Sequence, residues 1–459
     1  MATNGFSLIA TLLLPSLLSS MVTPEKITTS LVDQVSQLVT PKQAILYSQA
    51  TTKTYYVSAS GSDSNDGLST SSPFKTIQKA ANLTNPGDTV LIMNGVYTND
   101  SPVGQVIKIT RSGTMNAWIT YKAYPGHYPK LKHNGWNGIS IQDGASYIEI
   151  NGLEVIGNSA NITLDYAISQ KTNTSNPLTS GNCISIDGRR NGHPHHIRIL
   201  NNKVHDCPGA GISAIQTDYV TIDGNEVFNN AWYSPFGHSG ISLYQNWRFD
   251  NNTGYKMYVR KNKVYNNRQY IPWLYTGVIE DGNGIIIDDS RNTQNNSTLG
   301  AYTGRTLVEN NITYKNGGSG IHTYKSQYVD ILHNTAYLNN QSPEIKHGQI
   351  FANNSTDVNI VNNILYAPPN KYININSQNT RVTYNYNIYA NSTLMETRGY
   401  NDILADPKFV NPSQGDFRLQ ATSPAINKAY PWTSLKSDYA NQARPSNAGY
   451  DIGAYEYQF

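Results

Sequence analysis

The sequence predicts an all-β fold, a right-handed parallel β-helix (solenoid) with a short N-terminal capping helix and a C-terminal cap. The first observation is a repeat. Six similar segments, CISIDG, GISAIQ, GISLYQ, GIIIDD, GIHTYK and GQIFAN, begin at Cys183, Gly211, Gly240, Gly284, Gly320 and Gly348. The second observation is that Ile, Val and Tyr alternate with polar residues in each repeat, while Asn and Gly mark the turns. Short strands repeating without an intervening helix favour stacked coils over a sandwich, a barrel or a propeller.

The first 53 residues precede the solenoid and divide into two segments. Residues 1–25 contain an apolar run that Pro15 and several serines interrupt, so the run suits a signal peptide better than a membrane span. No Lys or Arg precedes the run, and a membrane anchor or an unstructured leader is the alternative. Residues 26–53 are polar and aperiodic, and we interpret them as a linker. The predicted location is secreted or on the cell surface, with the periplasm as a further option.

Residues 54–405 are expected to form the solenoid, with a capping helix in PFKTIQKAANL (73–83), and residues 406–459 the C-terminal cap. A second strand follows the first in each coil, and each second strand carries an asparagine. These asparagines are predicted to stack and to hydrogen-bond through their amides, a structural role, and they are Asn202, Asn225, Asn262, Asn311, Asn334 and Asn363. Intervals of 44 and 36 residues between repeats place insertions beside two coils, where the working face of a solenoid often lies.

Composition and cysteine content limit the possible partners. The chain has 459 residues, of which 14% are charged, and a net charge of +3, so no strongly basic face for nucleic acid is expected. Such a chain tolerates a polyanionic partner, and we expect a monomer whose mature form does not enter a membrane. Cys183 and Cys207 are separated by 24 residues, close to one repeat. A disulfide between neighbouring coils and two unpaired buried cysteines are both compatible with that spacing.

Aligning the repeats separates inward from outward side chains of the first strand. The two outward columns contain Ser185, Ser213, Ser242, Ile286 and His322, and then Asp187, Ile215, Tyr244, Asp288 and Tyr324. The residues that directly follow the second column are Gly188, Gln216, Gln245, Asp289 and Lys325. Neighbouring coils of a parallel sheet lie about 4.8 Å apart. The alignment therefore predicts that Asp288, Asp289, His322 and Lys325 share one patch, with Tyr244 and His238 one coil away.

Four acids surround the apolar strand Ile285 to Ile287, namely Glu280, Asp281, Asp288 and Asp289. Adjacent like charges raise one another's pKa or require a cation. Carboxylate oxygens are suitable ligands for Ca²⁺, so the four acids are predicted to bind Ca²⁺ directly or together with substrate. The alternative is that Asp288 and Asp289 cap a turn and pair with Arg291 or Lys325.

The segment YYVSASGSDSNDGLSTSSPFKTIQKAANLTNPGDTVLIMNGVY (55–97) resembles the N-terminal cap of secreted β-helix proteins in the pectate lyase superfamily, in particular the Pel9A-like group. The closing segments ADPKFVNPSQGDFRLQATSPAIN and YDIGAYEYQF resemble the C-terminal ends of such proteins. The resemblance covers roughly residues 54–459. It implies a carbohydrate-active enzyme, a polysaccharide lyase that cleaves a polyuronate such as pectate or alginate by β-elimination.

In Pel9A-like lyases, a D-D-G-x-D calcium motif precedes a G-F-K strand whose lysine is the base. This chain has EDGNG at 280–284 and SGIHTYK at 319–325, so Gly284 replaces the last acid and His322 stands where the lysine would fall. A histidine suits the role of base because its ordinary pKa is about 6.5. His322 and Lys325 are therefore the candidate catalytic residues, and His238, Tyr244 and Tyr324 are expected to contact substrate.

Two other functions remain open on the same fold. Asp288, Asp289 and His322 could imitate the paired acids and histidine of a β-helix glycoside hydrolase, although the N-T-D and R-I-K strands of polygalacturonases are not visible. The second alternative is a non-catalytic solenoid that binds glycan through the aromatic side chains of Tyr244, Trp247, Trp273 and Tyr275. No P-loop, GxGxxG, CxxC or HExxH pattern indicates nucleotide, redox or zinc-protease chemistry.

Overall fold

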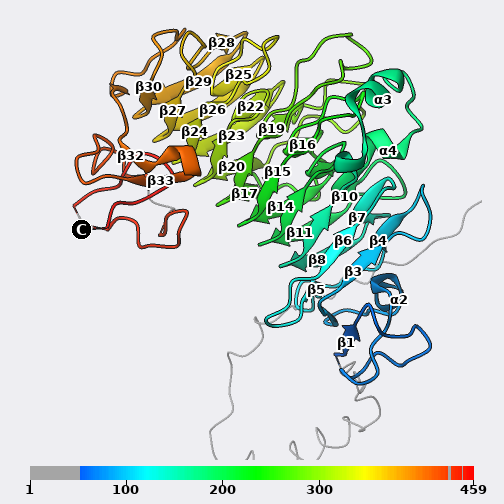
Figure 1. Ribbon diagram of the computed structural model, residues 1–459. Helices are drawn as coiled ribbons and strands as arrows, with labels where there is room; N and C mark the ends of the chain where they lie inside the picture. Colours follow the sequence, from blue (N-terminus) through cyan, green and yellow to red (C-terminus); the bar gives the residue numbers. More distant parts are fainter. Residues whose placement is uncertain (1–51, 433–435, 447, 459) are drawn as a thin grey trace, which may run out of the picture. The chain divides into compact units, whose positions relative to one another are not determined.

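The computed structural model describes residues 52–432, 436–446 and 448–458, which form stacked coils of short strands (Figure 1). Strands of successive coils pair into three long parallel sheets, which we name A, B and C. The prediction of a right-handed parallel β-helix is confirmed. The predicted signal peptide and residues 26–51 of the predicted linker lie outside the described residues.

The three sheets follow one another around each coil. Sheet A contains, in spatial order, β1 (Thr54–Val57), β2 (Thr89–Ile92), β5 (Ile119–Ala123), β8 (Ser146–Asn151), β11 (His195–Leu200), β14 (Asp218–Asp223), β17 (Tyr255–Arg260), β20 (Arg305–Glu309), β23 (Gln327–Leu332), β26 (Thr356–Val361) and β29 (Thr380–Asn385). Sheet B contains β3 (Val96–Thr98), β6 (Lys130–Lys132), β9 (Glu154–Ile156), β12 (Lys203–His205), β15 (Glu226–Phe228), β18 (Lys263–Tyr265), β21 (Ile312–Tyr314), β24 (Thr335–Tyr337), β27 (Ile364–Tyr366), β30 (Ile388–Ala390) and β31 (Ile403–Leu404). Sheet C contains β4 (Gln105–Ile109), β7 (Asn137–Gln142), β10 (Asn182–Asp187), β13 (Ile212–Ile215), β16 (Ile241–Tyr244), β19 (Ile285–Asp288), β22 (Ile321–Tyr324), β25 (Ile350–Asn353) and β28 (Asn376–Ser377).

The register of sheet C is the one that the repeat alignment predicts. Ile241 pairs with Ile285, and Ile285 pairs with Ile321 on the next coil. All three isoleucines are fully buried. Alternate residues of each strand therefore fill the interior with stacked aliphatic side chains, which removes apolar surface from water along the whole solenoid.

The asparagine column forms the predicted hydrogen-bonded ladder. Asn262 is typical, because its backbone N–H and its Nδ2 both donate to Asn311 Oδ1 at 3.0 Å and its Nδ2 also donates to the Ile222 carbonyl at 2.9 Å. A second ladder, which the sequence analysis missed, follows sheet B and contains Asn230, Asn267, Asn316 and Asn339. These amides satisfy backbone groups where the chain turns between sheets.

A short helix, α2 (Ile77–Ala81), covers the N-terminal coil as predicted. Thr76 caps it by accepting a hydrogen bond from the Lys79 N–H at 3.2 Å. Gln78 exchanges two hydrogen bonds with the backbone of Lys108 in β4, at 2.7 and 3.1 Å. The helix thereby protects the terminal strand of sheet C, whose edge would otherwise be open to pairing with another chain.

The remaining elements lie outside the coils. The insertion between β9 and β10 contains η1 (Ser159–Asn161), α3 (Leu164–Ser169) and α4 (Pro177–Ser180). In the C-terminal segment, β32 (Phe409–Asn411), η2 (Pro412–Gln414) and β33 (Asp416–Leu419) form a hairpin whose Phe417 packs on the outer side of sheet B, with ring centroids 5.3 Å from Tyr314 and 5.1 Å from Tyr337. None of the helices in the described part of the chain is long and apolar enough to span a membrane.

Candidate active site

The outer face of sheet C carries the column that the sequence analysis singled out. Tyr244 pairs in register with Asp288, and Asp288 pairs with Tyr324. The residue after each of these strands adopts a left-handed backbone conformation, with φ of 49° at Asp289 and 47° at Lys325. This conformation turns the chain from sheet C toward sheet A, so Asp288 and Asp289 enter different surroundings although they are adjacent in sequence.

Asp289 is a structural residue of the turn that follows β19. Its fully buried carboxylate accepts hydrogen bonds from Thr293 N and Thr293 Oγ1 at 2.8 Å, from Gln294 N at 2.8 Å and from Gln245 Nε2 at 3.0 Å. This occupies the lone pairs that a cation would need. The alternative that Asp289 caps a turn is therefore correct in this structure, although its partners are not Arg291 or Lys325.

The carboxyl groups of Asp281 and Asp288 both have raised pKa values, and we call these two residues the acid pair. Burial, and next the charges of Asp281 and Asp289, hold the pKa of Asp288 well above its ordinary value. Burial and the nearby Glu280 raise the pKa of Asp281 to about 7. A hydrogen bond that Asn283 Nδ2 donates to Asp281 at 3.0 Å opposes this rise. Burial also raises the pKa of Glu280. Near neutral pH this group of acids therefore retains protons that it can donate.

Tyr244 and His238, two of the predicted substrate-binding residues, have pKa values shifted by burial and by nearby charges. The Tyr244 hydroxyl accepts a hydrogen bond from Asn295 Nδ2 at 2.7 Å, and burial followed by the charges of Asp288 and Asp289 raises the pKa of Tyr244 to about 12. Burial and then the charge of Arg189 lower the pKa of His238 to about 4, so the His238 imidazole is neutral.

Two cations of this face differ in their partners. Arg189 is held by Asp187 through hydrogen bonds at 2.9 and 2.7 Å. Lys325 Nζ lies 5.1 Å from the centre of the Tyr324 ring, and its charge lowers the pKa of Asp288 in opposition to burial. Within the described residues, Lys325 Nζ forms no ion pair and no hydrogen bond. The Lys325 amine is thus available to a ligand.

His322 lies on the outer face of sheet C but is covered. Its ring stacks on Phe351 with centroids 4.7 Å apart and lies 5.6 Å from His347, and only 6% of the residue is exposed. Burial and the charge of His347 lower the pKa of His322 well below its ordinary value. The expectation that His322 faces an open groove is wrong, because the segment before β25 folds over it.

The sequence from residue 55 to residue 363 matches the model of the Pel9A-like, right-handed β-helix region. The chain belongs to the Pel9A-like β-helix family. Among solved structures, pectate lyase Pel9A has the same fold, with 16% identity, a TM-score of 0.51 and coverage of 89% of this chain and 97% of that chain. The complex of XylC with xylose has 12% identity, a TM-score of 0.48 and coverage of 88% and 99%, and the GH136 lacto-N-biosidase from Eubacterium ramulus has 14% identity, a TM-score of 0.41 and coverage of 77% and 67%. No curated protein matches the chain.

The side chains of the four acids do not gather around one point in the described part of this Pel9A-like protein. No three acidic or histidine side chains of this face, all of which lie in the described part of the chain, bring ligand atoms within 4.8 Å of one another. Asp289 is occupied by its turn, whereas Asp281 and Asp288 each accept one side-chain hydrogen bond. The predicted Ca²⁺ ion remains a prediction, and Asp281 and Asp288 are the acids that could bind it together with a substrate.

A pocket of about 470 Å³ in the Pel9A-like protein lies between the loop that contains Glu280 and the loop that contains His347, and neither Asp281 nor Asp288 lines it. The four aromatic residues considered for glycan binding do not form one platform. Trp247 stacks on His193 with centroids 4.7 Å apart, and Trp273 instead packs edge-on against Tyr275 at 5.5 Å.

Sequence reasoning missed Arg189 and His347 as members of this site. Arg189 lies two residues after Asp187, which belongs to the second outward column. This short distance from the column could have indicated that Arg189 reaches the same face. His347 lies in an insertion without a repeat pattern, so no sequence signal placed it beside His322.

Proposed function

We propose that this chain is a polysaccharide lyase that cleaves a polyuronate by β-elimination on the outer face of sheet C. The observation that carries the proposal is the free amine of Lys325 beside Asp288, because a lyase needs a base next to groups that accommodate the sugar carboxylate. Membership of the Pel9A-like family and the fold shared with a pectate lyase support the same chemistry. The segment 1–25 is proposed to direct the chain to the outside of the cell.

Elimination requires the chain to move one proton and to stabilise one charge. In the proposed mechanism, Lys325 first releases a proton to solvent, and its amine then removes the proton on C5 of the uronate. The electron pair forms the C4–C5 double bond, and the bond from C4 to the leaving oxygen breaks. The protonated forms of Asp281 and Asp288 donate hydrogen bonds to the sugar carboxylate or to the leaving oxygen, which stabilises the developing negative charge. The leaving oxygen takes up a proton from one of these carboxyl groups, and solvent restores it.

His322 is the second candidate for the base. Its two ring nitrogens are buried without hydrogen-bond partners, so the imidazole has a free lone pair. It could reach a sugar only after the segment that contains His347 moves away. Substitutions at His322 and Lys325 distinguish the two bases.

Hydrolysis is the alternative function, and the raised pKa values of Asp281 and Asp288 favour it specifically. A protonated carboxyl group is the usual general acid of a glycoside hydrolase. The purified protein should therefore be incubated with pectate, alginate and neutral polysaccharides, with calcium and with a chelator. New ultraviolet absorbance from an unsaturated uronate supports elimination, whereas reducing ends without that absorbance support hydrolysis. Binding without either product would indicate a non-catalytic glycan-binding solenoid.

A further inference from the structure

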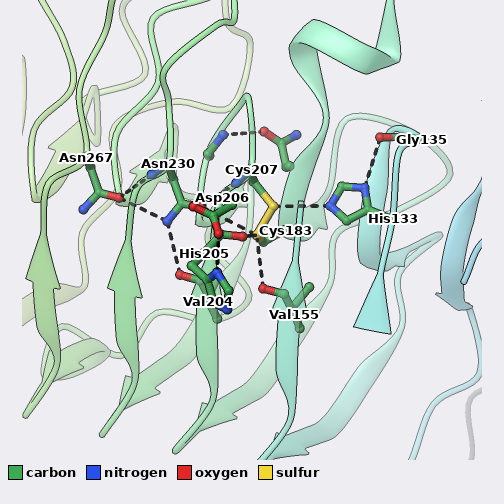
Figure 2. Close-up of a disulfide and its surroundings, with 12 residues drawn as sticks. His133, Gly135, Val155, Cys183, Val204, His205, Asp206, Cys207, Asn230 and Asn267 are labelled. Carbon is green, nitrogen blue, oxygen red and sulfur yellow. Dashed lines mark hydrogen bonds and ion pairs between the residues drawn. A yellow bond between two sulfur atoms is a disulfide. The ribbon is translucent and has the colours of Figure 1, made fainter. Parts of the chain in front are cut away.

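A second cluster of chemically active side chains lies away from the candidate active site. His133, Cys183 and Cys207 are buried, and the ligand atoms that they offer all lie within 4.8 Å of one another (Figure 2). Cys183 belongs to β10, Cys207 follows β12 and His133 follows β6, so three segments that are distant in the sequence supply the cluster. Cys183 and Cys207 form a disulfide, which resolves the two alternatives that the sequence left open.

Cys207 occupies the end of the second asparagine ladder. Its backbone N–H donates to Asn230 Oδ1 at 3.0 Å, in the same way that the Asn230 N–H donates to Asn267 Oδ1 at 3.1 Å (Figure 2). The backbone around Cys207 is therefore fixed by the ladder as well as by the disulfide. The hydrogen bond to Asn230 does not involve the sulfur, so reduction of the disulfide leaves it intact.

His133 directs an unprotonated nitrogen at the sulfurs. Its Nδ1 lies 3.2 Å from the Gly135 carbonyl, which can only accept, so Nδ1 carries the proton. Its Nε2 then has a lone pair and lies 3.3 Å from Cys207 Sγ, which has no proton to donate while it is in a disulfide. The side chain is 2% exposed, and burial lowers the pKa of His133 to about 4. His133 Nε2 is thus a buried acceptor without a donor.

The surrounding backbone leaves room for the His133 ring beside the Cys207 sulfur. Gly157 lies on the coil between His133 and Cys207, and a Cβ atom there would come within 2.6 Å of Cys207 Sγ. The carbonyl oxygen of His205 and Asn230 Oδ1 lie 3.4 and 3.6 Å from Cys183 Sγ. Sulfur, nitrogen and oxygen atoms therefore converge on one enclosed point.

We propose that reduction of the Cys183–Cys207 disulfide converts this cluster into a binding site for a thiophilic divalent cation of the Zn²⁺ class. A phosphine or dithiol reductant supplies two electrons, the S–S bond breaks and two thiols form. The cation then displaces both thiol protons and binds the two thiolates and His133 Nε2. Two cysteines and one histidine are a known zinc ligand set that leaves one position open. The cation would link the same coils that the disulfide links under oxidising conditions.

The test is a titration of the reduced full-length protein with Cd²⁺, followed by thiolate-to-metal charge-transfer absorbance. We expect one Cd²⁺ per chain, and we expect His133→Gln to weaken the affinity at least about tenfold. His127→Gln is the matched control, because His127 is only partly buried, lies outside the cluster and accepts a hydrogen bond from Asn94 N, and this variant should bind Cd²⁺ like the wild type.

A measurement on the wild type tests the proposal even if the His133 variant does not fold. X-ray absorption of the reduced, zinc-loaded protein should show two sulfur atoms and at least one imidazole nitrogen around zinc. The proposal is overturned if reduced protein shows no charge-transfer absorbance, if the His133 variant binds Cd²⁺ as tightly as the control, or if zinc has no imidazole ligand. Loss of the native β circular dichroism on reduction, with and without metal, would also overturn it.

Discussion

Asp281 and Asp288 are coupled acids on the outer face of sheet C: burial and, next, the charge of Asp281 hold the pKa of Asp288 well above its ordinary value. Asp281 precedes β19 and Asp288 is its last residue, so the apolar part of the strand separates them in sequence. Their coupling gives this face protonated carboxyl groups near neutral pH, which suits proton donation in either elimination or hydrolysis.

The first prediction concerns stability and pH at Asp281. The unfolded carboxyl group ionises near its ordinary pKa of 3.8, whereas the folded group ionises at about 7, so the free energy of unfolding falls as pH rises between these values and stays low above them. Asp281→Asn removes this penalty and retains Oδ1 for Asn283. Chemical denaturation in a chelator should show a gain of about 1–3 kcal/mol at pH 8 and a smaller gain at pH 5.

The control for this measurement is Asp165→Asn on the exposed side of α3, which should change stability by less than about 0.5 kcal/mol at both pH values. An equal gain at pH 5 and pH 8 would contradict the assigned ionisation of Asp281.

The second prediction concerns the base. Lys325→Met removes the free amine and preserves the aliphatic stem, so turnover of the active polysaccharide should fall by about two to four orders of magnitude. Lys315→Met is the control, because Lys315 shares the left-handed conformation but follows β21 of sheet B. Near-normal turnover of Lys325→Met, measured by formation of unsaturated product, would eliminate Lys325 as the base.

The third prediction concerns His322. His322→Phe replaces two buried nitrogens that lack partners and allows stacking on Phe351, so stability should be unchanged or rise by about 1–2 kcal/mol. His333→Phe is the comparison, because the His333 nitrogens do have partners, at 3.1 Å from the Asp451 carbonyl and 2.9 Å from Asn362 Nδ2, and that variant should lose stability. Turnover of His322→Phe should stay within tenfold of wild type, and a loss of about a hundredfold or more would assign the base to His322 instead.

The fourth prediction concerns the first asparagine ladder. Asn262→Ala removes the Nδ2 donor to Asn311 and to the Ile222 carbonyl, and it removes the Oδ1 acceptor of the Asn225 backbone N–H. Backbone groups of neighbouring coils are left unpaired, which should destabilise the protein by about 2–4 kcal/mol in urea denaturation. Asn161→Ala, at an exposed position of η1, should cost less than about 0.5 kcal/mol. Similar costs for the two variants would argue against a structural role for the ladder.

The fifth prediction concerns calcium. Because no three ligand groups of the acid cluster converge without substrate, chelation should leave the melting temperature of the free protein unchanged. Turnover on a polyuronate should fall on chelation if substrate oxygens complete a site with Asp281 and Asp288. A large stabilisation by Ca²⁺ alone would show a preassembled site, and no effect of chelation on turnover would remove calcium from the mechanism.

The sequence by itself determined the coils and their register. Ile241, Ile285 and Ile321 stack as the repeat alignment predicts, because the alternation of inward and outward side chains is a local property of a strand and equivalent positions of a solenoid repeat meet. The Asn262 column was readable for the same reason.

Only the tertiary structure decided which outward residues are accessible. His322 is covered by His347, and Asp289 is enclosed by Thr293 and Gln294, because insertions outside the repeats fold over the sheet. The left-handed conformation at Asp289 also turns the chain away from sheet C directly after Asp288. Such coverage and protonation depend on packing between segments distant in the chain, which alternation within a strand does not encode.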